Sequence, residues 1–147
     1  MTTFFIDTNV ILYTYDLRQP VKQGQAAIWL SRIARRRLPT INLQVINEFC
    51  HVALRKLPEL SADDIREQAA LLREWGETPL DFDTLERAWD VRVETGYGWF
   101  DCTLLAAAQM LDCDVFLSED MQHGRVLGPL TIINPFRVDP DAFLEAN

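Results

Sequence analysis

Short runs of apolar residues alternate along this chain with longer segments in which apolar residues recur every three or four positions. This alternation restricts the fold more than any other feature, because the short runs predict strands and the longer segments predict helices. Expected strands cover residues 3–6, 39–43, 78–82, 114–118 and 130–136. Expected helices cover residues 9–15, 21–36, 44–56 and 100–113, with two more beginning near Ser61 and Asp83. Alternating strands and helices indicate an α/β fold, a three-layer α/β/α domain whose central sheet is mostly parallel.

Local patterns describe the expected helices more closely. One apolar stripe has the helical spacing i, i+3, i+4, i+7 and consists of Ala26, Trp29, Leu30 and Ile33. The helix over residues 44–56 is expected to bury Val45, Phe49, Val52 and Leu54. Two pairs have the spacing of a capping box, Ser61 with Asp64 and Asp83 with Glu86.

Length and composition fit one domain without a membrane segment. The chain has 147 residues, 48% of them hydrophobic, which is enough for a core, and we expect a single domain over residues 1–147. No stretch approaches the ~18 apolar residues that a membrane-spanning helix needs. Asp7 interrupts the only apolar run near the N-terminus, which also argues against a signal peptide. We therefore expect a cytoplasmic protein with no membrane partner.

Cysteine, histidine and net charge exclude several kinds of site. The cysteines are three in number and form no CxxC pair, which favours reduced, buried thiols over disulfides or a zinc site. Two histidines are too few for a multi-histidine metal centre. The net charge of −8 argues against simple electrostatic binding of nucleic acid. It is compatible with an acidic site that recruits a divalent cation, because the cation inverts the local field.

Four acidic residues occupy equivalent places in this pattern. Asp7 directly follows the first expected strand, and Asp120 follows the strand over residues 114–118. Glu48 lies early in the helix after the second strand, and Asp101 opens the helix over residues 100–113. In a parallel α/β layer, strand ends and helix starts share one edge of the sheet, where ligands bind. All four carboxylates are therefore expected to converge on one crevice.

Each acid also has a plain structural interpretation. Asp101 would serve as a helix cap, Asp120 as a turn residue, and Glu48 as a solvated helix carboxylate. Asp7 is the hardest to explain in this way, because "FFI" precedes it and "VIL" follows within three residues. A buried carboxylate without a partner is costly. The four interpretations would also have to hold independently of one another.

Carboxylates gathered at one edge repel one another unless a cation lies among them. The only lysines, Lys22 and Lys56, are both distant in sequence from the four acids' motifs. Mg²⁺ and Mn²⁺ prefer oxygen ligands and are held by a few carboxylates plus water. Sites of that kind cleave phosphodiesters by activating water and by stabilising charge on the phosphate. The pattern thus favours a Mg²⁺ or Mn²⁺ site.

The same residues resemble the PIN-domain family of metal-dependent ribonucleases, and within it the VapC-type toxins of bacterial type II toxin–antitoxin systems. The family's opening motif, an apolar strand followed by Asp-Thr-Asn or Asp-Thr-Ser, is similar to "FFIDTNVILYTYD". Its glutamate on the helix after the second strand is similar to that in "LQVINEFCHV". Its third and fourth acids are similar to those in "WFDCTLLAAAQMLDCDVFLSEDMQHG". The matching segments occur in the family's order and extend through most of the chain.

The resemblance implies a PIN-like fold, a site and a reaction. It assigns the catalytic and metal-binding roles to Asp7, Glu48, Asp101 and Asp120. It assigns hydrogen-bonding support to Thr8, Asn9 and Ser118, with Glu119 as a substitute for Asp120 if that assignment fails. The implied activity is Mg²⁺- or Mn²⁺-dependent hydrolysis of RNA phosphodiesters. The implied protein partners are a cognate antitoxin and a second copy of the chain in a homodimer.

Two other functions remain open at this point. A phosphatase of the haloacid dehalogenase type would use Asp7 as its nucleophile, but that class expects an acid where Asn9 stands and a Thr or Val where Ile11 stands. A PIN-like fold that only binds, without catalysis, is the second alternative. The cluster Arg32, Arg35, Arg36 and Arg37 suits either RNA contact or a helix C-terminus, and His123 and Arg125 either touch substrate or are merely exposed.

Overall fold

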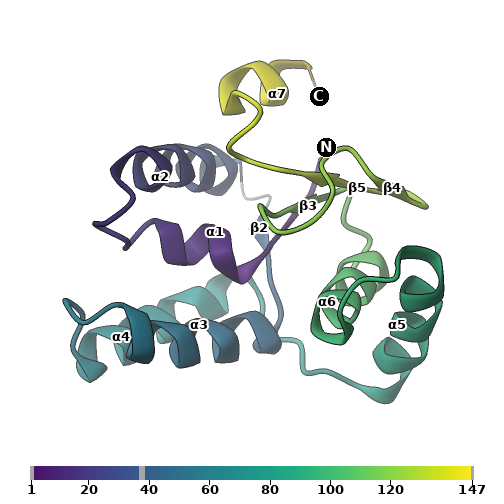
Figure 1. Ribbon diagram of the computed structural model, residues 1–147, viewed down its shortest axis with the longest axis horizontal. Coiled ribbons are helices and arrows are strands. Elements are labelled where there is room, and N and C mark those ends of the chain that lie inside the picture. Colours follow the sequence, from purple (N-terminus) through teal and green to yellow (C-terminus); the bar gives the residue numbers. More distant parts are fainter. Residues whose placement is uncertain (1, 37–38, 147) are drawn as a thin grey trace.

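A five-stranded sheet forms the centre of the computed structural model, which describes residues 2–36 and 39–146 (Figure 1). The strands are β1 (Phe4–Ile6), β2 (Pro39–Thr40), β3 (Val115–Leu117), β4 (Val126–Leu127) and β5 (Leu130–Ile133). Their order is β2-β1-β3-β5-β4, and only β4 runs antiparallel to its neighbour. The prediction of a mostly parallel α/β sheet is confirmed.

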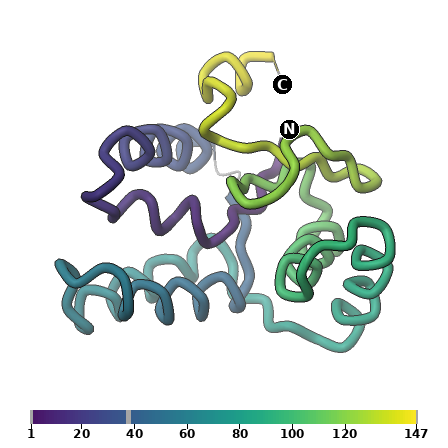
Figure 2. The backbone as a smooth tube through the Cα atoms, in the orientation of Figure 1, coloured from purple at the N-terminus to yellow at the C-terminus, as the bar shows by residue number. Residues whose placement is uncertain are grey.

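Helices flank the strands, and several helices follow one another between β2 and β3, as the path of the backbone shows (Figure 2). The helices are α1 (Thr8–Tyr13), α2 (Pro20–Arg35), α3 (Leu43–Lys56), α4 (Ala62–Leu72), α5 (Phe82–Thr95), α6 (Trp99–Met110) and α7 (Pro140–Ala146), with a 3₁₀ turn, η1 (Arg73–Trp75), after α4. In Figure 1, α1 to α4 lie together on one side of the strands, and α5 packs beside α6 on the other. In the described part of the chain, no helix is long and apolar enough to cross a membrane.

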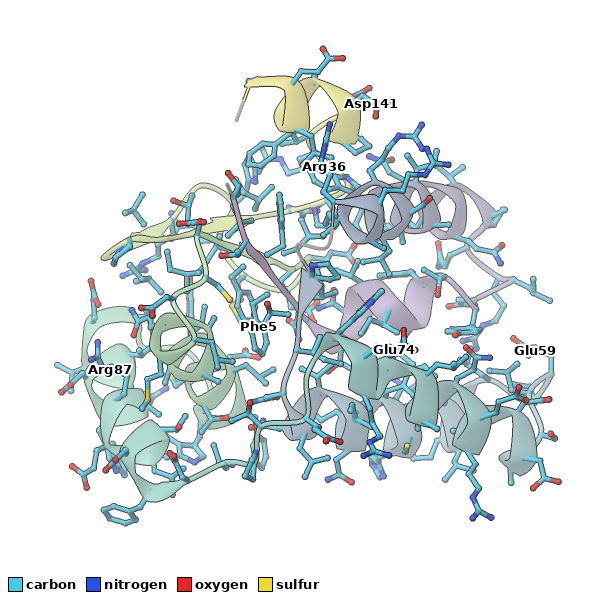
Figure 3. The ribbon with its side chains drawn as sticks, turned by 180° about the vertical axis from the view of Figure 1, so that it is seen from behind. Phe5, Arg36, Glu59, Glu74, Arg87 and Asp141 are labelled. Atoms are coloured by element: carbon cyan, nitrogen blue, oxygen red, sulfur yellow. The ribbon has the colours of Figure 1, made fainter. Side chains whose placement is uncertain are left out.

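The middle strands are apolar throughout because they are buried on both faces. All residues of β1 and β3 are buried, as expected for parallel strands covered by helices. Phe5 stacks on Phe116 of the adjacent strand, with 5.3 Å between ring centroids and 8° between ring planes. Figure 3 shows Phe5 inside the molecule, whereas Arg87 and Glu59 lie at its periphery. The predicted stripe on α2 is also buried, and the Trp29 indole donates a 2.7 Å hydrogen bond to the Pro135 carbonyl.

Several local expectations are wrong. Residues 78–82 form no strand, because Thr78 makes only an isolated bridge with Asn42 and Asp81 caps the following helix. The cap of α5 is therefore Asp81, whose side chain accepts from the Thr84 N–H, and Asp83 lies within the first turn. The predicted capping box of Ser61 and Asp64 is confirmed.

The second strand and the helix after it also differ from expectation. The strand ends at Thr40 because Asn42 caps α3, its side chain accepting from the Val45 N–H at 3.1 Å. Leu54 is 63% exposed, because the buried face of α3 consists of Val45, Ile46, Phe49 and Ala53. Strand β4 and helix α7 were not predicted; each is short and lacks a long periodic pattern.

The strand register aligns the residues that follow β1 and β3. Ile6 pairs with Leu117, and Leu117 pairs with Ile133. The Asp7 N–H donates to the Leu117 carbonyl at 3.0 Å, and the Ser118 N–H donates to the Ile133 carbonyl at 3.0 Å. Asp7 and Ser118 therefore emerge side by side at the carboxyl edge of the sheet.

Candidate functional site

Asp7 is a carboxylate at this edge with only 5% of its surface exposed. It is the N-cap of α1, and its Oδ1 accepts a 2.7 Å hydrogen bond from the Thr8 N–H. Its Oδ2 accepts from the Ser118 hydroxyl at 2.7 Å and from the Asn9 amide at 3.1 Å. Both oxygens are thus held by the start of the next helix and by the neighbouring strand end.

Asn9 connects Asp7 with Asp120. Its Nδ2 donates to Oδ2 of Asp120 at 3.0 Å and also lies 3.2 Å from the Ser118 hydroxyl oxygen. Its Oδ1 accepts from the Glu119 N–H at 3.4 Å, which turns the amide so that its NH₂ group faces the carboxylates. The Asp120 N–H donates to the Ser118 hydroxyl oxygen at 3.2 Å.

Glu48 reaches the same edge from the second turn of α3. Its Oε2 accepts from the Thr8 hydroxyl at 3.0 Å, and its Oε1 accepts from the Gln44 amide at 3.1 Å. The Gln44 Oε1 in turn accepts from the Thr103 hydroxyl at 3.1 Å. Hydrogen bonds therefore connect α1, α3 and α6 through the Glu48 carboxylate.

Asp101 is the acid that a purely structural role, such as a helix cap, explains least. It is the third residue of α6 and half-buried, whereas the cap of α6 is Gly98. No donor among the described residues bonds its carboxylate, so it does not cap the helix. A half-buried carboxylate with no donor costs free energy in the absence of a cation. Its place at a helix start, where the macrodipole favours negative charge, offsets part of that cost.

The carboxylates influence one another's protonation. Burial raises the pKa of Asp7 to about 7, against the lowering effect of the hydrogen bonds from Ser118 and Thr8, and the charges of Asp101 and Asp120 raise it further. Burial also raises the pKa of Asp101, with smaller contributions from Asp120 and Glu48. The four predicted site acids therefore lie within electrostatic reach of one another.

Cations are scarce at this edge. Within residues 2–36 and 39–146, no ion pair involves any of the four acids; Lys22 pairs instead with Glu119, 97 positions later in the sequence. In the same described ranges, no group of three or more Asp, Glu, His or Cys side chains is already arranged to hold a metal ion. Asn9, Ser118, Thr8 and Gln44 bond the carboxylates instead. The atoms of the four acids that could bind a cation are nonetheless all carboxylate oxygens, the type of ligand that Mg²⁺ and Mn²⁺ prefer.

Sequence reasoning missed three residues at this edge. Gln44 lies four residues before Glu48, a spacing that brings side chains together on a helix and that offered a signal. Thr103 and Lys22 gave no signal, because only the tertiary fold brings them to Gln44 and Glu119.

Several of the basic residues considered for substrate contact make contacts within the fold. His123 accepts from the Asn134 N–H at 3.0 Å, and the Arg125 guanidinium lies 5.5 Å from the Tyr97 ring centroid and donates to the Glu94 carbonyl. Arg32 pairs with Asp141 of α7, and Arg36 and Asp141 both lie toward the α7 end of the molecule (Figure 3). The described members of this cluster end α2 just before β2, which puts them at the amino edge of the sheet, opposite the acids. Arg37 lies outside the described residues.

Comparison with known proteins gives a family match and several similar structures. The model of the PIN domain family matches residues 4–127. A search of curated proteins finds no match. A chain of a toxin–antitoxin complex from Klebsiella pneumoniae is 17% identical with a TM-score of 0.68, over 90% of this chain and 98% of that chain.

Two further structures have the same fold. VapC20 from Mycobacterium tuberculosis, a Sarcin-Ricin loop cleaving toxin, is 18% identical with a TM-score of 0.55, over 78% of this chain and 87% of that chain. VapBC2 from Rickettsia felis, bound to a promoter DNA fragment, is 12% identical with a TM-score of 0.62, over 89% of this chain and 97% of that chain. The family model spans both the acid that follows β1 and the acid that follows β3, and by this match the chain belongs to the PIN-domain family.

Proposed function

We propose that this chain is a metal-dependent endoribonuclease and the toxin of a type II toxin–antitoxin pair. The observation that carries the proposal is the meeting of Asp7, Glu48, Asp101 and Asp120 at the carboxyl edge of the sheet in a PIN-domain chain. A fold hosts many activities, so the argument depends on the chemistry of this edge. Carboxylates with raised pKa values in such a place are candidates for function.

The acids fit a Mg²⁺ or Mn²⁺ ion by their donor chemistry. Asp7 and Asp101 would bind it directly, with Glu48 and Asp120 binding directly or through water. The unbonded carboxylate of Asp101 supports this assignment, because a cation would supply the partner that the described residues do not. When bound, the cation would lower the pKa of water and stabilise negative charge on the phosphate.

The side chains of this site would orient the reactants. Thr8, Asn9 and Ser118 hold the Asp7 carboxylate at a fixed rotation, and Gln44 with Thr8 does the same for Glu48. Glu48 or Asp120 would accept a hydrogen bond from the attacking water and align it with the phosphorus. Water would then add to phosphorus as the bond to the 3′ oxygen breaks, leaving a 5′-phosphate and a 3′-hydroxyl.

RNA and two protein partners complete the proposal. RNA is proposed because the similar VapC20 cleaves the Sarcin-Ricin loop. A cognate antitoxin is proposed because similar chains come from toxin–antitoxin complexes. The homodimer and a cytoplasmic location remain proposals, to be tested by the mass of the protein in solution and by cell fractionation.

Cleavage of RNA by purified protein tests the function directly. We expect a 5′-labelled RNA to be cut with Mg²⁺ or Mn²⁺ and left intact with EDTA, with products that carry 5′-phosphate ends. Asp7→Asn keeps the side-chain shape but removes the charge, and should lower the rate by a factor on the order of 10²–10³. Asp90→Asn, an exposed position on α5, is the matched control and should cleave at the parent rate. Equal rates for the parent protein and Asp7→Asn would exclude the proposal.

The two alternative functions predict different experimental results. A phosphatase of the haloacid dehalogenase type would form a trappable phosphoaspartate on Asp7, and membership of the PIN-domain family argues against it. A non-catalytic module would bind RNA or an antitoxin without any metal-dependent cleavage.

A further inference from the structure

Lys22 lies in the first turn of α2, yet its ammonium group contacts the segment that carries Asp120. Its Nζ forms an ion pair with Oε1 of Glu119. The first turn of α2 contains no acidic residue, and a cation there faces the positive end of the helix macrodipole. Glu119 supplies the negative charge that the start of this helix lacks.

Two aromatic rings hold the lysine in place. Its Nζ lies 5.2 Å from the ring centroid of Tyr13 and 5.3 Å from that of Phe136. The two rings pack edge to face, with 5.1 Å between their centroids. The side chains of Lys22 and Glu119 are 36% and 22% exposed, so the pair is partly screened from water. Such a pair contributes more than one on an open surface.

This contact lies in the middle of the segment over residues 118–120, which also carries Asp120. The Glu119 side chain points to Lys22, while its N–H donates to Asn9 Oδ1 at 3.4 Å. On either side of it, the Ser118 hydroxyl and the Asp120 carboxylate lie 3.2 and 3.0 Å from Asn9 Nδ2. Glu119 is thus held at both its side chain and its backbone, and its neighbours face the acids.

The two adjacent acids consequently differ in what they can bind. Among the described residues, Glu119 has a cation partner and Asp120 has none. The sequence alone left open which of them completes the acidic site. The ion pair with Lys22 favours Asp120 over Glu119 as the acid that completes the site.

We propose that Lys22 is a positioning residue, which by holding Glu119 turns Asp120 toward Asn9 and Asp7. Its consequence for metal binding rests on the proposed function, whereas its consequence for the conformation of residues 118–120 does not. We therefore pair a metal-binding measurement with a metal-free structural one.

The metal-binding arm uses Mn²⁺ titration by calorimetry. Lys22→Met removes the charge and keeps most of the length, and should weaken Mn²⁺ binding about tenfold, as should Glu119→Gln. The double variant should be no weaker than either single one, because both remove the same ion pair. Lys22→Arg should restore most of the affinity. Arg87→Met, at an exposed position on α5, is the matched charge control and should stay within about twofold of the parent.

The metal-free arm follows the side-chain amide resonances of Asn9 by NMR. They should shift in Lys22→Met and Glu119→Gln and remain in place in Arg87→Met. If the parent protein binds no Mn²⁺, the proposed function fails while this arm still decides the positioning role. Unshifted Asn9 resonances in Lys22→Met would overturn the proposal. So would loss of Mn²⁺ binding in Glu119→Gln with none in Lys22→Met, because Glu119 would then be the ligand itself.

Discussion

Asp7 is a residue for which folding stability and the proposed function favour different protonation states. Burial of its carboxylate favours the neutral form, whereas binding of a cation requires the charged form. The donors from Thr8, Asn9 and Ser118 offset part of the burial cost, and the pKa still rises to about 7. Between about pH 4 and pH 7, the folded protein therefore retains a proton on Asp7 that the unfolded chain has already lost.

The metal-free protein is consequently expected to lose stability as the pH rises. The ordinary pKa of 3.8 applies to the unfolded chain and a pKa of about 7 to the folded chain. The stabilisation from this group is complete below about pH 4, decreases through pH 7 and is absent above it. Its full size is on the order of 4 kcal/mol. Urea unfolding in EDTA between pH 5 and pH 8 measures the part that is lost above pH 5, on the order of 3 kcal/mol.

Asp7→Asn is the control for that measurement, because it cannot titrate. Its free energy of unfolding should depend less on pH than that of the parent protein over the same range. Mn²⁺ should raise the melting temperature of the parent more at pH 8 than at pH 5.5, since protons compete with the cation. A pH dependence that is the same in both proteins would contradict the assignment of the titration to Asp7.

At the scale of elements, Gly76 determines how the segment after η1 passes the strand β2. It has φ of +142°, and a Cβ atom there would lie 2.1 Å from the Ile41 carbonyl oxygen. The Ile41 N–H also bonds the Trp75 carbonyl at 3.1 Å. This close approach lies just before Asn42, the cap of the helix that carries Glu48.

Gly76→Ala should destabilise the protein by about 2 kcal/mol or more, because both the backbone conformation and the space exclude a side chain. Gly24→Ala is the matched control, since Gly24 lies within α2 with open space around it. That change should stabilise the helix by about 0.5–1 kcal/mol. Urea unfolding of the two variants gives the comparison. Equal effects on the free energy of unfolding would contradict this account.

At the scale of the whole molecule, exposed apolar side chains gather on the helices beside the acids. Trp89 and Val93 of α5 are 58% and 87% exposed, and the Trp89 ring lies 4.5 Å from that of Trp99. Phe100, directly before Asp101, is 71% exposed. A pocket of about 830 Å³ continues from Phe100 along α3, and Glu48 is in its lining. Contiguous apolar surface of this kind is typical of protein interfaces.

The proposed homodimer is expected to bury Trp89 and Val93, because removing such side chains from water contributes about 25 cal/mol per Å². Changing both to Ser should shift the protein toward the monomer in sedimentation velocity. Val21→Ser is the control, as an exposed apolar residue on α2. An unchanged dimer in the double variant would mean that another surface holds the two copies.

Much of the fold could be predicted because local pattern and tertiary packing agree in it. The runs "FFI" and "VFL" are apolar throughout, and both became buried parallel strands. The expectation failed over residues 78–82, where β-forming residues lie beside Asp81, whose side chain instead caps α5. It failed again at Leu54, because helical rotation turns that position away from Phe49 and the core.

The sequence by itself determined most of the order of strands and helices, apart from β4, α7 and residues 78–82, and it placed Asp7, Glu48, Asp101 and Asp120 near strand ends and helix starts. These follow from periodicity and from local chemistry, which depend on residues close together in the chain. Only the tertiary structure decided that Lys22 meets Glu119, that Thr103 supports Gln44, and that Asn9 connects Asp7 with Asp120. These contacts depend on sheet order and helix packing, which bring together residues far apart in the chain, and no local pattern encodes them.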